Sequence, residues 1–260
     1  MDARTKKFII NVTKEIGKIH LNNFSATKKV KFKAKSKYLS DIITKVDKIS
    51  EDLFIKKTKK FGFKGTITTE ESGEVGLGNS NQRLIIDPLD GTFFYSRGIP
   101  NFCVAIALED NNKIICSTVY NAATNELFFA ERGAAYLNGK RIKVSNTRNI
   151  NKSTIIFSAY PKYKLKKVGS IFSNLMSFGG LRFLQHLGNL NLCYIADARY
   201  DAMIAFYRIL SEWDKIPGIF ILEQAGGKVT DFNGNKWNIN SNNIVSSNNK
   251  FHDKIIELLS

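Results

Sequence analysis

Cysteine is scarce in this chain of 260 residues, which has only Cys103, Cys116 and Cys193, set far apart among apolar neighbours. An odd number without a paired spacing argues against a disulfide framework and against a structural zinc site. We expect buried free thiols, which are typical of a reducing compartment. No apolar run approaches the roughly 20 residues needed to cross a bilayer, and the one near the N-terminus is too short for a secretion signal. The sequence therefore predicts a cytoplasmic protein with no membrane partner.

Acidic residues are few relative to basic ones, with 23 Asp and Glu against 39 Lys and Arg and a net charge of +16. A positive field attracts phosphates, nucleic acids and acidic proteins. No segment interleaves the lysines with aromatic residues as nucleic-acid-binding modules do, so a solvated, lysine-rich surface is the simpler interpretation. The apolar fraction of 43% is ordinary for a globular protein.

Hydrophobic periodicity predicts a mixed α and β chain whose sheets are covered by helices. Helices are predicted at residues 3–20, 47–60, 165–178, 188–198, 213–225 and 249–259. Strands are predicted at 30–34, 83–86, 102–108, 113–119, 127–129, 153–157, 181–184, 202–206, 228–231 and 244–246, with a hairpin turn at Asn138-Gly139. Pro88 should end the strand 83–86 at an acidic turn. We expect one domain over residues 1–260, with subdomains of about 1–148 and 149–260 divided at the polar stretch 145–152.

Four acidic motifs stand out. They are Asp41-Ile42-Ile43-Thr44-Lys45-Val46-Asp47, Thr69-Glu70-Glu71-Ser72-Gly73, Asp87-Pro88-Leu89-Asp90-Gly91-Thr92 and Trp213-Asp214. Each alone has an ordinary explanation as a turn, a solvated loop or a helix cap. In the third motif, however, two carboxylates at the end of a buried strand would repel and raise each other's pKa. Mg²⁺ would relieve that repulsion, and Gly91-Thr92 offers backbone N–H groups to an anion. Together these features predict a metal-assisted phosphate site.

With these motifs the sequence resembles the inositol monophosphatase family, within the lithium-sensitive, magnesium-dependent phosphatase superfamily that includes fructose-1,6-bisphosphatase. Further agreement extends over nearly the whole chain, at Gly98-Ile99-Pro100, Glu131-Arg132-Gly133, Leu137-Asn138-Gly139 and Glu223-Gln224-Ala225-Gly226-Gly227. The resemblance implies an α/β class fold, a layered α/β/α/β/α sandwich, commonly assembled as a homodimer.

The resemblance also implies a division of labour for two or three Mg²⁺ ions. The first ion would be held by Glu70, Asp87 and the carbonyl of Leu89, the second by Asp87, Asp90 and Asp214, and a weaker third would lie near Glu70. Asp47 and Thr92, with Glu70 beside them, would activate the attacking water. The helix starting at Asp214 would present its ligand from its first turn. Substrate contacts are expected from Asp90, Gly91, Thr92, Gly188, Asn189 and Asp214.

Three departures from the family pattern bear on the substrate. Phe94 replaces an asparagine, Asn189 replaces the serine of a Gly-Ser pair, and Tyr207 stands where a glutamate contacts inositol hydroxyls. A site without that hydrogen-bonding group should discriminate less among polyols. We predict a Mg²⁺-dependent phosphomonoesterase for a small sugar or polyol monophosphate, with a 3′-phosphoadenosine 5′-phosphate phosphatase or a histidinol-phosphate phosphatase as enzymatic alternatives.

A non-enzymatic alternative also follows from the resemblance. Some bacterial relatives act as RNA-polymerase-associated factors in ribosomal RNA transcription, and the net charge of +16 is compatible with contact to RNA or to the polymerase. The histidines His20, His186 and His252 lie outside the four motifs, so we expect structural or surface roles for them.

Overall fold

The computed structural model describes residues 1–24, 31–32, 42–159, 165–176, 181–183, 188–206 and 211–259. The helices in these ranges are α1 (Ala3–Asn23), α2 (Lys45–Phe61), α3 (Thr92–Ser96), α4 (Leu165–Leu175), α5 (Asn189–Ala196), α6 (Ile216–Gln224) and α7 (His252–Leu259), with a 3-10 turn at Ile150–Lys152. The strands are β1 (Lys31–Phe32), β2 (Ile42–Ile43), β3 (Thr66–Thr69), β4 (Gly73–Gly76), β5 (Gln82–Asp90), β6 (Cys103–Asp110), β7 (Lys113–Asn121), β8 (Glu126–Glu131), β9 (Ala134–Leu137), β10 (Lys140–Ile142), β11 (Ile155–Ala159), β12 (Leu181–Phe183), β13 (Ala202–Phe206), β14 (Lys228–Thr230) and β15 (Asn243–Ser247).

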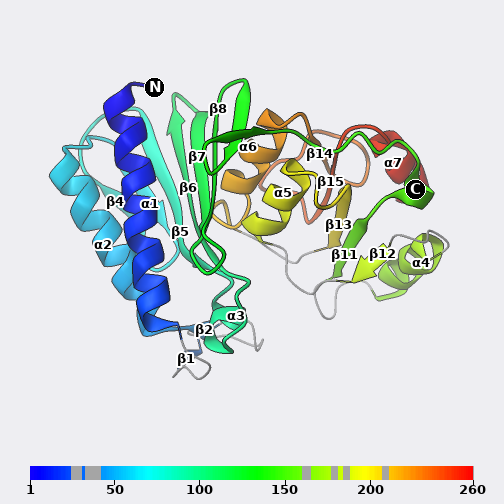
Figure 1. The fold of residues 1–260 in the computed structure, drawn as a ribbon, viewed down its shortest axis with the longest axis horizontal. Coiled ribbons are helices and arrows are strands. Elements are labelled where there is room, and N and C mark those ends of the chain that lie inside the picture. Colours follow the sequence, from blue (N-terminus) through cyan, green and yellow to red (C-terminus); the bar gives the residue numbers. More distant parts are fainter. Residues whose placement is uncertain are drawn as a thin grey trace.

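These elements stack in alternating layers (Figure 1). Helices α1 and α2 cover one face of an eight-stranded sheet ordered β10-β9-β8-β7-β6-β5-β3-β4. Helices α5 and α6 lie between that sheet and a five-stranded sheet ordered β12-β11-β13-β15-β14, whose far side carries α4 and α7. The predicted α/β/α/β/α sandwich is therefore confirmed.

The residue patterns explain the layers. On α1, the buried Ile9, Val12 and Ile16 recur at helical spacing and pack toward β5, β6 and β7. Most residues of α5 and α6 are buried, because a helix between two sheets leaves little of its surface to water. The core between the sheets joins residues such as Leu192 and Ile221 to strands on both sides.

Strand β5 contradicts the prediction that Pro88 ends it, because it continues to Asp90. Its pairing with β6 shifts register, since Asp87 lies opposite Ala105 while Asp90 lies opposite Cys103. One extra residue on β5 is a bulge, and a bulge tolerates a proline that has no N–H to donate. The irregular stretch brings both aspartates to the end of a buried strand that is parallel to β3 and antiparallel to β6.

Most of the other predicted elements are present, while some observed elements were not predicted. The predicted helices and the other predicted strands are present with shifted ends, and the Asn138-Gly139 turn has both φ angles positive, at 49° and 81°. The hairpin of β3 and β4 and the short helix α3 were not predicted. Of the strand expected at 30–34, only Lys31–Phe32 lies among the described residues, paired with β2. The three thiols are free and buried, as expected.

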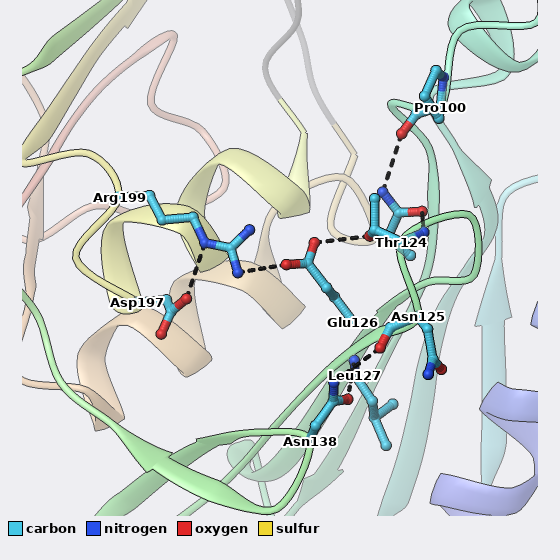
Figure 2. Close-up of polar contacts among 9 residues, drawn as sticks. Pro100, Thr124, Asn125, Glu126, Leu127, Asn138, Asp197 and Arg199 are labelled. Carbon is cyan, nitrogen blue, oxygen red and sulfur yellow. Dashed lines mark hydrogen bonds and ion pairs between the residues drawn. The ribbon is translucent and has the colours of Figure 1, made fainter.

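A polar cluster joins the segment after α5 to β8 (Figure 2). Arg199 Nη2 lies 2.5 Å from Glu126 Oε1, and Asp197 Oδ2 accepts a hydrogen bond of 3.0 Å from Arg199 Nε. Thr124 Oγ1 donates to the other Glu126 oxygen at 2.8 Å. The cluster therefore connects the eight-stranded sheet to the chain leading into β13.

The polar stretch 145–152 connects β10 of one sheet to β11 of the other. The division into subdomains at this stretch stays a prediction. Among the described residues, every helix is too short or too polar to span a bilayer.

Candidate active site

Asp47 lies in the first turn of α2 and is almost fully buried. Thr44 is the N-cap: its Oγ1 accepts from Val46 N at 3.1 Å, while Asp47 Oδ2 accepts from Thr44 N at 2.8 Å. This reciprocal capping box satisfies the exposed N–H groups of the helix end. The cap explanation offered for this motif is thus correct for Thr44, and Asp41 lies outside the described residues.

The same Asp47 carboxylate also faces Thr92. Thr92 Oγ1 lies 2.8 Å from Asp47 Oδ1 and 2.9 Å from the carbonyl oxygen of Leu89. A hydroxyl has one proton, so these two acceptors compete for it. Burial raises the pKa of Asp47 to about 6, against the lowering effect of its hydrogen bonds from Thr44 and Thr92. A carboxylate with a pKa near neutrality is suited to act as a general base.

Asp87 is the most desolvated carboxylate of the acidic run. Burial raises its pKa well above the ordinary value, and the charges of Glu70, Asp90 and Asp214 raise it further. Its Oδ1 accepts a hydrogen bond of 3.0 Å from Leu89 N, which turns the backbone at the bulge. The four carboxylates, predicted from three motifs, therefore interact electrostatically at Asp87.

Asp90 is held by the start of α5. Its Oδ2 accepts from Asn189 N at 2.7 Å and from Asn189 Nδ2 at 3.0 Å. Asn189 Nδ2 also reaches the carbonyl of Trp213 at 3.0 Å, and its Oδ1 accepts from Gly218 N at 2.8 Å. Asn189 is fully buried and Gly188 is the N-cap of α5. Asn189 therefore joins β5, α5 and α6 through its hydrogen bonds. Its direct contact with a substrate remains a prediction.

Asp214 does not lie in the first turn of α6, contrary to the prediction. The helix begins at Ile216, with Pro217 in its first turn, and Lys215 occupies the N-cap. Asp214 instead belongs to the preceding turn, where its Oδ2 accepts from Ser211 N at 2.6 Å. Surrounding protein desolvates its carboxyl group and raises the pKa to about 7, and the charges of Glu70 and Asp90 add to the shift.

Gly91 is required by geometry at the end of β5. Its φ of +90° is in the left-handed region, and a Cβ there would lie 2.5 Å from the carbonyl oxygen of Asn101. The chain turns at Gly91 into α3, so Thr92 begins that helix. Only glycine meets both demands without strain.

The donor chemistry of this site fits a hard divalent cation, since carboxylate and carbonyl oxygens are the ligands that Mg²⁺ prefers. Burial, together with the charges of Glu70, Asp90 and Asp214, raises the pKa of Asp87, and such a cation relieves this condition. Within the described ranges, however, no three His, Cys, Asp or Glu side chains come together as a ready-made ion cage. Asp90 and Asp214 point oxygens at backbone N–H groups instead.

Two contacts at the site were not predicted. His20 Nε2 lies 2.9 Å from the carbonyl of Pro88 and, because a carbonyl only accepts, carries the proton. Arg83 contacts both carboxylate oxygens of Glu109 and also reaches Glu212, close to Asp214 in the chain. His20 thus holds the acidic run at Pro88, and Arg83 holds the turn that contains Asp214 through Glu212. His186 and Tyr207 lie outside the described residues.

Comparison with known proteins identifies the family. The sequence profile described as the inositol monophosphatase family matches residues 2–260. The chain belongs to the inositol monophosphatase family. A fructose-1,6-bisphosphatase/inositol-1-monophosphatase from Thermotoga maritima is 29% identical over 97% of this chain and 94% of its own length. The Nus factor SuhB of Escherichia coli K12 is 33% identical over 92% of this chain and 89% of its own.

Solved structures agree with this inositol monophosphatase assignment. The extragenic suppressor protein suhB from Bartonella henselae superposes with a TM-score of 0.89, at 29% identity, over 98% of both chains. The family is one of metal-dependent phosphatases, and its relatives here carry both phosphatase names and Nus factor names. The resemblance stated from the motifs is therefore confirmed.

Proposed function

We propose that this chain is a Mg²⁺-dependent phosphomonoesterase that hydrolyses a small sugar or polyol monophosphate. The observation that carries the proposal is the burial of Asp87 beside the charges of Glu70, Asp90 and Asp214, which together raise its pKa well above the ordinary value. A divalent cation offsets the unfavourable interaction of these charges with a buried carboxylate. We expect a cytoplasmic homodimer that holds two or three Mg²⁺ ions.

The chain's own residues define the roles in this proposal. Glu70, Asp87, the Leu89 carbonyl, Asp90 and Asp214 would hold the ions. Bound Mg²⁺ supplies charge neutralisation for the phosphate and lowers the pKa of a coordinated water. Asp47, whose pKa lies near 6, accepts through the Thr92 hydroxyl the proton that the attacking water loses, so that Thr92 keeps its own proton count. The backbone N–H groups of Gly91 and Thr92 orient the phosphate oxygens.

The first test is Asp87→Asn, measured with Mg²⁺ and a panel of phosphomonoesters. Turnover should fall to background, because the substitution removes the carboxylate shared by both predicted ions. The melting temperature without Mg²⁺ should stay equal or rise, since a destabilising buried charge is lost. Asp110→Asn, the same change at the other end of the β5–β6 pair, is the control and should keep full activity. Near-normal turnover by Asp87→Asn would contradict the proposed phosphatase function.

The same panel decides the substrate class. It should include inositol 1-phosphate, fructose 1,6-bisphosphate, 3′-phosphoadenosine 5′-phosphate and histidinol phosphate. We expect the sugar and polyol phosphates to be the best substrates, with modest discrimination among them because Tyr207 stands where a glutamate would contact the polyol hydroxyls. Inhibition by lithium is expected with Mg²⁺ below saturation.

A role in transcription is the second candidate, and two observations favour it. One relative is the Nus factor SuhB, and the exposed outer layer is rich in lysine, for example at Lys56, Lys59 and Lys60 of α2. Binding of RNA or RNA polymerase should then persist in Asp87→Asn, because the site is not part of that surface. Failure of both wild type and variant to bind at physiological salt would exclude this role.

A further inference from the structure

Glu51 is a buried carboxylate that no motif singled out. It lies on α2, one helical turn after Asp47, and its side chain has no exposed surface. Glu51 Oε2 accepts hydrogen bonds from Thr69 Oγ1 at 2.6 Å and from Glu71 N at 3.0 Å. Glu51 Oε1 accepts a short hydrogen bond from Ser72 Oγ. Three donors on one four-residue segment therefore converge on a single side chain.

Glu70 lies inside the segment that Glu51 holds. Thr69 and Glu71, its two chain neighbours, each donate to the same Glu51 oxygen. Strand β4, which follows the turn, is at the edge of the sheet and mostly exposed. The β3–β4 ladder and a contact of 3.3 Å from Lys48 Nζ to Ser72 Oγ also restrain this turn. The hydrogen bonds to Glu51 therefore restrain the residues on both sides of Glu70.

The hydrogen bonds that Glu51 accepts favour its ionised form. Burial alone would raise its pKa, but the hydrogen bonds from Ser72 and Thr69, with that from Glu71 N, outweigh burial and lower it. Hydrogen bonds to an ionised acceptor are about twice as strong as neutral ones. Residues i and i+4 share one face of a helix, so α2 presents Asp47 and Glu51 on the same side. One rigid element thus sets the position of Asp47 and that of the turn carrying Glu70.

We propose that Glu51 is a positioning residue that fixes Glu70 relative to Asp47 and thereby sets the affinity of the site for Mg²⁺. The inference rests on the proposed metal-dependent function. Partners that orient a metal ligand typically change metal affinity by about 10- to 100-fold when they are removed. A residue that only stabilised the β3–β4 hairpin would lower the melting temperature and leave that affinity unchanged.

The test compares Glu51→Gln, Ser72→Ala and Asp52→Asn in the full chain. Mg²⁺ affinity is measured by calorimetry and by the Mg²⁺-dependent rise in melting temperature, and the Mg²⁺ concentration for half-maximal hydrolysis is measured in parallel. Glu51→Gln should weaken Mg²⁺ binding by about 10- to 100-fold, with kcat recovering at saturating Mg²⁺. Ser72→Ala removes one donor on the turn but keeps the Glu51 charge, and should weaken binding by about tenfold.

The variants separate positioning from simple electrostatic attraction. Asp52→Asn removes an exposed charge from the same helix and should bind Mg²⁺ as wild type does. Wild-type Mg²⁺ affinity in both Glu51→Gln and Ser72→Ala overturns the proposal, even if both variants melt earlier. If Glu51→Gln does not fold, Ser72→Ala alone decides. If the wild type itself neither binds Mg²⁺ nor hydrolyses phosphomonoesters, the proposed function has failed rather than the role of Glu51.

Discussion

Gly91 carries two separate constraints at one backbone position. Its positive φ excludes most side chains, and the Asn101 carbonyl occupies the space that a Cβ would need. Gly133 has nearly the same φ, +87°, but open space around it. Comparing alanine substitutions at the two glycines therefore separates the cost of backbone strain from the cost of a steric collision.

We predict that Gly133→Ala costs about 1 kcal/mol of unfolding free energy, the cost of placing alanine in the left-handed region. Gly91→Ala should cost at least about twice as much, because the collision shifts β5 or the Asn101 segment. It should also abolish phosphatase activity, whereas Gly133→Ala retains it. Urea unfolding and hydrolysis assays on both variants check this, and equal losses of stability would contradict it.

Single residues with a chemical role were predictable because they occur in short motifs. Asp87, Asp90 and Thr92 are near neighbours in the sequence, so local spacing brings them together. Glu51 and Asn189 were not assigned their positioning contacts, because their partners lie 18 to 99 residues away in the sequence. The signal available for Glu51 was its i+4 spacing from Asp47, which places both on one face of a helix.

At the scale of elements, α2 both caps itself and presents Asp47. The capping box of Thr44 and Asp47 satisfies the helix N-terminus with the side chain that also meets Thr92. The side chain that caps the start of α2 is therefore also the candidate general base.

We predict that Thr44→Ala destabilises the fold by about 1 kcal/mol through loss of the cap. It should also lower kcat, because Asp47 Oδ2 loses its hydrogen bond from the Thr44 hydroxyl. Thr44→Ser keeps the hydroxyl and should resemble wild type in both respects. The measurements are chemical unfolding and steady-state hydrolysis, and a Thr44→Ala protein that matches Thr44→Ser would refute the prediction.

The ends of elements were less predictable than their existence. Pro88 should have stopped β5, yet a bulge accommodates it, and bulges depend on the partner strand rather than on local sequence. Strands β3 and β4 are short and contain no strongly alternating apolar pattern, so their pairing across Glu70–Gly73 left no clear local signal. Helix α6 starts after Asp214 because Pro217 favours the first turn.

At the scale of the whole molecule, long-range ion pairs join segments that local sequence does not relate. Glu126 and Arg199 link β8 to the chain after α5 (Figure 2), and Glu126 is 15% exposed. Lys228 and Asp253 form a comparison pair 2.8 Å apart in which the carboxylate is 84% exposed. Screening by water should make the two pairs differ in strength.

We predict a coupling energy of about 0.5–1 kcal/mol between Glu126 and Arg199 in a double-mutant cycle with Glu126→Gln and Arg199→Met. The cycle of Lys228→Met and Asp253→Asn should give a coupling close to zero, because the Asp253 carboxylate keeps its water. Free energies of unfolding in denaturant provide both values. A larger coupling for the exposed pair would argue against a structural role for the Arg199 cluster.

The placement of α5 and α6 between two sheets also determines how the chain can be produced. A recombinant fragment cut at 145–152 would leave the N-terminal piece with an uncovered apolar sheet face. The C-terminal piece would keep two mostly apolar helices without the sheet that buries them. Such surfaces drive association of incomplete chains during synthesis. The two halves are therefore expected to fold together, and separate expression should yield aggregates rather than two independent proteins.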